Sequence, residues 1–116
     1  MILHLIPAPT WKALGDADTY EPPSLADEGF IHCTGDDELM LDVANMFYGH
    51  LEDAFVLSID EHDLAAEVRW EQPVGEPGAP LFPHVYGPLN LDAVVGVRRL
   101  VRDTSGRFAS YVAVND

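Results

Sequence analysis

Two short apolar runs of this sequence carry side chains that can do chemistry. The first, residues 29–35, reads Gly-Phe-Ile-His-Cys-Thr-Gly and places His32 beside the only cysteine of the chain. The second, residues 82–88, reads Phe-Pro-His-Val-Tyr-Gly-Pro and contains His84 and Tyr86. Titratable side chains inside apolar runs are either fully hydrogen-bonded or functional. We therefore interpret the two runs as partners across a cleft.

Three histidines, His4, His32 and His84, lie in apolar stretches that predict strands. Imidazole acts as an acid, a base, a metal ligand or a hydrogen-bond donor near neutral pH. Each histidine taken alone also fits a hydrogen-bonded core residue, so a site requires that the three strands meet. Their spacings of 28 and 52 residues match no metal-binding motif, and we expect no metal.

Four further residues are candidates for such a site. Tyr86 shares a strand face with His84, so its ring can orient a ligand or stack on one. Glu71 ends a predicted strand and is the carboxylate best placed to take part. Thr34 precedes a helix, where it can cap the helix or hold a ligand, and three acidic residues that follow favour the cap. Cys33 is expected to be a small buried thiol, and becomes a nucleophile only if a base lies within reach.

The elements that must position these residues are mostly short strands. Apolar or alternating stretches that predict strands fall at residues 1–6, 30–33, 54–59, 68–71, 82–86 and 95–102. Brief helical turns are expected at residues 11–14, 24–27, 60–64 and 91–94. Residues 16–23 and the Pro- and Gly-rich residues 72–81 predict surface loops, and residues 109–116 form either part of a weak last strand or a tail.

The clearest helix follows Thr34 and ends at Gly49. Its first turn is acidic, which suits the positive end of the helix dipole. Its apolar residues recur at helical spacing and are expected to face the sheet: Leu39, Val43, Met46 and Phe47. The whole pattern predicts one α+β domain, with a mixed or largely antiparallel sheet, one main helix and short helical turns.

Composition restricts the partners. The 116 residues include 20 acidic and 6 basic side chains, for a formal net charge of −14. This charge repels phosphate backbones and anionic membranes, so we expect a small-molecule or nucleotide ligand and neither nucleic acid nor membrane. No apolar run is long enough to span a membrane, no signal peptide is visible, and one cysteine fits a reducing compartment. The expected location is therefore cytoplasmic.

Several phrases of the sequence resemble one bacterial family, the domain of unknown function 952. These phrases are residues 29–34, 43–48 and 82–89, the opening Leu3-His4-Leu5 with Trp11, and Trp70-Glu71. The resemblance extends over about residues 2–108. The family carries no assigned reaction, so it implies a fold without implying an activity.

The order of elements is also remotely similar to the ADP-ribosyltransferase fold, which implies a split sheet with a cleft for NAD. By that resemblance His4 would hold the adenosine-side ribose, with Thr34 nearby, and His32 and Tyr86 would frame the nicotinamide. His84 would stand where transferases carry a catalytic glutamate, and an imidazole stabilises an oxocarbenium-like transition state poorly. Glu71 is the candidate replacement, so the catalytic candidates are His32, His84 and Glu71.

Three functions follow from these expectations. The first is an enzyme that binds NAD or a related nucleotide and transfers or hydrolyses its ADP-ribose. The second is a non-catalytic module that kept the fold, lost the catalytic glutamate, and binds a small ligand or a protein. The third is a hydrolase of another substrate that depends on histidine.

Overall fold

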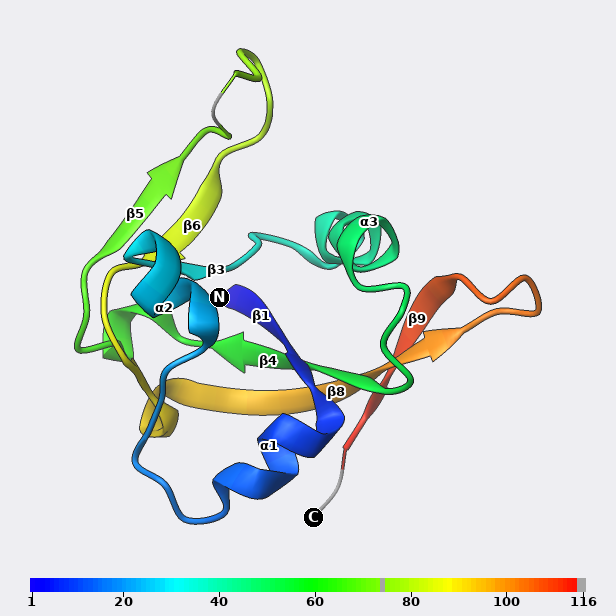
Figure 1. Cartoon of the computed structure of the whole chain (residues 1–116), viewed down its shortest axis with the longest axis horizontal. Helices are drawn as coiled ribbons and strands as arrows, with labels where there is room; N and C mark the ends of the chain where they lie inside the picture. Colours follow the sequence, from blue (N-terminus) through cyan, green and yellow to red (C-terminus); the bar gives the residue numbers. More distant parts are fainter. Residues whose placement is uncertain (74, 115–116) are drawn as a thin grey trace.

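A four-stranded antiparallel sheet forms the centre of the molecule, and its strands follow the order β1-β4-β8-β9 (Figure 1). The computed structural model describes residues 1–73 and 75–114. The strands are β1 (Ile2–Pro7), β2 (Thr19–Tyr20), β3 (Ile31–His32), β4 (Ala54–Ile59), β5 (Val68–Glu71), β6 (Phe82–Val85), β7 (Leu89–Asn90), β8 (Val94–Arg102) and β9 (Phe108–Ala113). The helices are α1 (Ala8–Leu14), α2 (Pro23–Glu28) and α3 (Asp37–Phe47), with 3-10 turns η1 (Glu61–Asp63) and η2 (Leu91–Ala93).

Alternation along β1 sends its side chains into two separate cores. Ile2 and Ile6 join the core that α1 covers, whereas Leu3 and Leu5 join the core that α3 covers. Because neighbouring side chains of a strand point to opposite faces, one short strand can serve both. The sheet is therefore covered on both faces, and β1 and β4 are almost entirely buried.

A second, three-stranded sheet carries most of the predicted site. Its order is β3-β6-β5, and His32 pairs with His84 while Arg69 pairs with His84 from the other side. A single bridge between Leu3 and Thr34 joins this sheet to β1. In Figure 1 the β5–β6 hairpin and α3 lie on either side of the segment that contains β3.

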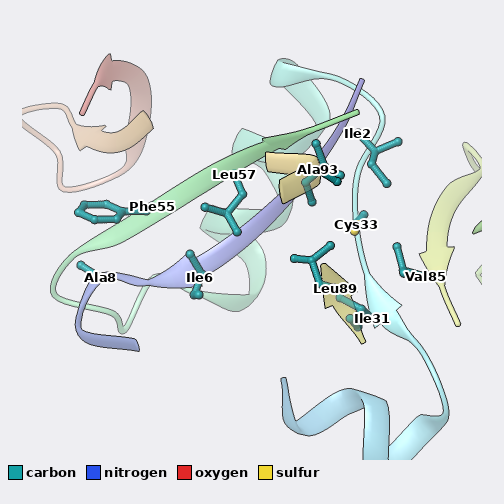
Figure 2. Packing of buried hydrophobic residues seen from close by; sticks show 11 residues of the cluster. Ile2, Ile6, Ala8, Ile31, Cys33, Phe55, Leu57, Val85, Leu89 and Ala93 are labelled. Atoms are coloured by element: carbon teal, nitrogen blue, oxygen red, sulfur yellow. The ribbon is translucent and has the colours of Figure 1, made fainter. Parts of the chain in front are cut away.

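The larger core holds the two sheets together. Figure 2 shows that side chains of β1 and β4 gather with residues from the β3 segment, β6, β7 and η2. The members from outside the central sheet are Ala8, Ile31, Cys33, Val85, Leu89 and Ala93. The short strands β2 and β7 pair with each other, so Leu89 is fixed over this core.

The structure confirms the predicted α+β domain with one main helix and short helical turns. All strand pairs within the described residues are antiparallel, so the antiparallel part of the prediction is confirmed and no parallel pair occurs there. One expectation was incomplete, because the predicted loop over residues 16–23 contains β2. Of the two alternatives for the end of the chain, β9 over residues 108–113 confirms the last strand, while residues 115–116 lie outside the described part of the chain.

The main helix departs from prediction in its cap and in its buried side. The side chain of Asp36, and not Thr34, caps α3 by accepting a hydrogen bond from the Leu39 amide. The helix buries Met40 and Ala44 against the sheet, whereas Met46 and Phe47 are 73% and 63% exposed. The predicted apolar stripe of α3 is thus present, but it faces away from the central four-stranded sheet.

Candidate functional site

A cavity of about 900 Å³ lies between α3, the β3 segment and β6. This volume falls in the range of ligand pockets. His32, Thr34 and His84 line it, so the structure brings these three predicted residues together. The exposed stripe of α3 forms one wall, through Leu39, Val43, Met46 and Phe47. Five residues of the predicted surface loop add to the lining: Gln72, Pro73, Glu76, Ala79 and Pro80.

His84 is held by a carboxylate. Its Nδ1 lies 2.9 Å from Oε1 of Glu71, and the Tyr86 hydroxyl donates to the same oxygen. The hydrogen bonds from Tyr86 and His84 hold the pKa of Glu71 below its usual range, and the bond to Glu71 raises the pKa of Tyr86. An ionised carboxylate only accepts, so Nδ1 carries a proton, and Nε2 of the neutral imidazole is then an acceptor.

An aromatic cluster fixes the plane of this imidazole. The Phe30 ring stacks on His84 with a centroid distance of 4.1 Å and an interplanar angle of 25°. Phe30 also contacts the rings of His32 and Tyr86, at 4.9 and 5.4 Å. Stacked and edge-on aromatic contacts of this kind restrict ring rotation. His84 is therefore oriented by Glu71 through one ring edge and by Phe30 through one ring face.

His32 lies on the more open side of the cluster. Its Nε2 is 2.8 Å from Oε2 of Glu28, and about half of each side chain is exposed. The His32 and His84 rings meet edge to face at 5.5 Å. The backbone of this segment is set by Gly29, which ends α2 in the left-handed region with φ of 89° and turns the chain into β3. The two histidines are thus neighbours in space although 52 residues separate them.

Thr34 and Gly35 lie in the segment that connects β3 to α3, and Thr34 lines the cavity. Thr34 is 3% exposed, and its Oγ1 has no hydrogen-bond partner among the described residues. A Cβ on Gly35 would lie 3.0 Å from the Trp70 ring, so a larger residue is crowded here. This close approach brings the end of β5 near the start of α3.

His4 occupies a different place. It is 7% exposed, its Nδ1 lies 2.7 Å from the carbonyl oxygen of His32, and it is not part of the cavity lining. Burial lowers the pKa of His4, which keeps the imidazole neutral. His4 therefore supports the backbone of β3, and the structure does not bring it into the cavity with His32 and His84.

Cys33 is a buried thiol, as expected. It is 3% exposed, and burial raises its pKa to about 12, so the thiol stays protonated near neutral pH. Among the described residues no group of three or more histidine, cysteine or acidic side chains is arranged to hold a metal ion. None of the helices in the described ranges is long and apolar enough to cross a membrane.

Sequence reasoning missed three parts of the site. Phe30 was counted as a strand residue, but it contacts three of the candidate side chains. Glu28 was not considered, and its contact with His32 depends on the turn at Gly29 between α2 and β3, so no local pattern would have found it. The apolar stripe of α3 was identified and assigned to the core. Glu71 and Tyr86 were predicted, and the structure places them behind His84 and outside the lining.

Fold and site together define an antiparallel α+β domain with a histidine-bearing cleft between its main helix and a small sheet. The chain belongs to the family described as Protein of unknown function (DUF952), whose model matches residues 5–97. The crystal structure of protein CC0527 from Caulobacter crescentus is similar, with 23% identity, a TM-score of 0.73, and coverage of 91% of this chain and 90% of that one. The solution structure of CC0527 gives 24% identity, the same TM-score, and coverage of 92% and 90%. No curated protein matches the chain.

Proposed function

We propose that the cleft binds a small organic molecule and that His84, held by Glu71, moves a proton to or from it. The observation that supports this proposal is the Glu71–His84 contact of 2.9 Å behind a cavity that His84 lines. Because Nδ1 donates its hydrogen bond to Glu71, the neutral imidazole has Nε2 available as a base. A carboxylate behind the imidazole also stabilises the imidazolium that forms when His84 accepts a proton.

NAD is the ligand that the remote resemblance to ADP-ribosyltransferases implies. Its nicotinamide is a flat cation, which suits the stacked rings of Phe30 and His84 and the carboxylate of Glu28. In hydrolysis, His84 would take a proton from the attacking water while the bond between ribose and nicotinamide breaks, and nicotinamide leaves neutral. Transfer replaces that water with a hydroxyl or amine of an acceptor. Glu71 lies behind His84 and outside the lining, so it would act on the ribose only through that histidine.

A second candidate is a histidine-dependent hydrolase of an uncharged or cationic substrate. The observation that favours it is the absence of lysine and arginine from the described residues that line the cavity. The diphosphate of NAD would therefore find no cation within the lining.

The third candidate is a module that binds a small ligand or a protein without catalysis. It would be recognised by binding without turnover.

The first test is a thermal-shift screen joined to an assay for nicotinamide release. Wild type, His84→Ala, Glu71→Gln and the control His50→Ala would be screened with NAD, ADP-ribose, nicotinamide and a panel of small uncharged esters and amides. A ligand at about 100 times its Kd stabilises the protein by roughly 2.7 kcal/mol, which is readily seen. His50 is an exposed residue outside the lining, so its variant reports non-specific effects.

The expected result is a shift with at least one ligand in wild type and His50→Ala that is lost in His84→Ala. Turnover should fall by about 10²-fold or more in Glu71→Gln if proton transfer is involved, with binding largely kept. Stabilisation by NAD with no nicotinamide release would support the binding module. Cooperative melting with no shift from NAD or ADP-ribose would remove the nucleotide candidate, and no shift from any compound would remove the proposal.

A further inference from the structure

The charged residues that line the cavity all have one sign. Glu28, Asp42 and Glu76 belong to the lining, and no lysine or arginine does among the described residues. Glu28 pairs with His32. Asp42 and Glu76 take part in no ion pair within residues 1–73 and 75–114. The lining therefore holds negative charge that the protein itself leaves uncompensated.

Two basic side chains close to α3 and the small sheet are engaged in ion pairs. Arg98 forms a bidentate pair with Asp37 of α3 at 2.7 and 3.0 Å. Arg69 of β5 pairs with Glu67 at 2.8 Å and lies over the Tyr86 ring. The chain has a net charge of −14, and no lysine or arginine among the described lining residues offsets the negative potential of the cleft.

Apolar side chains make up much of the lining around these carboxylates. Met46 and Phe47 are largely exposed on α3, and Phe30 and Phe82 line the cavity from the small sheet. At the floor, Thr34 provides a buried hydroxyl whose Oγ1 has no partner among the described residues. An unsatisfied buried hydroxyl and an exposed apolar wall are both costly to leave without an occupant. Together with the carboxylates they specify the kind of molecule that fits.

We propose that the cleft selects an organic cation with an apolar body, such as an arylalkyl ammonium group, and discriminates against anions. The aromatic or alkyl part packs between Phe47 and Phe30, and the ammonium group lies near Asp42 and Glu76. This inference rests on the proposed function, since it names the ligand class of the same cavity. It does not depend on whether His84 is catalytic.

Three compounds of matched shape test the charge preference. Phenethylamine, 2-phenylethanol and 3-phenylpropionate share an aryl ring and a short chain, and at neutral pH they are a cation, a neutral molecule and an anion. Each would be titrated into the protein while backbone amide signals of β3, β6 and α3 are followed by NMR. Because two solvent-exposed carboxylates each contribute modestly, we expect the amine to bind about tenfold more tightly than the anion, with the alcohol between them.

Charge-neutralising variants then locate the preference. The double variant Asp42→Asn with Glu76→Gln should reduce the ratio between amine and carboxylate to about unity, while the affinity for the alcohol stays the same. Asp16→Asn removes one negative charge at an exposed position outside the lining, and it should leave the ratio unchanged. Raising the salt concentration should weaken the amine alone.

The possible outcomes distinguish a failure of the charge preference from a failure of the proposed function. Equal affinities for the three compounds, or tighter binding of 3-phenylpropionate, overturn the charge class and leave a binding cavity in place. A preference for the amine that the double variant retains also overturns the inference, because it would arise elsewhere. Absence of binding by all three, in protein whose amide spectrum shows a folded state, overturns this inference, whereas the proposed binding site falls only if the thermal-shift screen also finds no ligand.

Discussion

Helix α3 carries two apolar stripes, one buried in the core and one that lines the cavity. Met40 and Ala44 are 2% and 0% exposed and pack with Leu5 and Val56 of the central sheet. The other stripe, from Leu39 to Phe47, lines the cavity and includes the most exposed large apolar side chain of the described residues, Met46. One helix thus presents a core face and a cleft face about a quarter of a turn apart.

The difference shows which stripe stabilises the fold. Burial of apolar area is the main favourable term in folding, and exposed apolar side chains contribute little of it. The cleft stripe contains more apolar residues than the core stripe, yet it is left open to the cavity. An apolar surface kept open at the mouth of a cavity is typical of a binding site.

Two methionines on the same helix allow the largest expected effect to be measured against a matched control. Met40→Ala should lower the free energy of unfolding by about 2–4 kcal/mol, because it leaves a cavity in the core. Met46→Ala makes the same chemical change at a side chain that is 73% exposed, and it should cost less than about 0.5 kcal/mol. Urea denaturation of both variants measures the two values, and similar losses would contradict the assignment of the two faces.

The sequence predicted the elements better than it predicted their orientation. Strands with a continuous apolar run, such as β4, and strands bounded by Pro and Gly, such as β6, were found because local pattern specifies them. The buried side of α3 was wrong because periodicity identifies an apolar stripe but does not say whether a sheet or a ligand covers it. The pairing of β2 with β7 was missed since two-residue strands have no periodicity.

The candidate site shows the same limit. His32 and His84 were identified as polar residues in apolar runs, and the two runs do meet. They meet as neighbouring strands β3 and β6 of one sheet, and not across a cleft as predicted, because the cavity lies between this sheet and α3. His4 satisfied the same pattern and yet bonds to the main chain, because alternation along β1 turns it to the face opposite α3. The stacking of Phe30 on His84 depends on contacts between segments over 50 residues apart, which one sequence cannot specify.

A smaller effect is expected where α3 is attached to β8. The Arg98 guanidinium beside Asp37 holds the pKa of that carboxyl below its usual value. A carboxyl with a depressed native pKa stabilises the fold above its unfolded pKa of about 4, and this contribution is lost as the pH falls through the native pKa. Asp37→Asn should therefore cost about 0.5 kcal/mol at pH 7, since the pair is largely exposed, and nothing at low pH.

Chemical denaturation of wild type and Asp37→Asn between pH 7 and pH 3 tests this sign. The gap between the two stabilities should close as the pH falls below about 4. Asp16→Asn is the control, because Asp16 is exposed and has no ion pair within the described residues. A gap that stays constant with pH would mean that the substitution acts through something other than the ionised carboxylate.

The smallest effect on stability is expected at Phe47, an aromatic side chain of α3 that lines the cavity. Phe47 is 63% exposed, so Phe47→Ser removes little buried area and should change the free energy of unfolding by less than about 0.5 kcal/mol. The same change removes an aromatic wall from the cavity, and the affinity for an arylalkyl ligand should fall several-fold. Urea denaturation and an NMR titration with phenethylamine give the two values on one variant. If Phe47→Ser destabilises the protein by more than about 1 kcal/mol, the cleft stripe helps to hold the fold together, and its exposure is no longer evidence for a ligand.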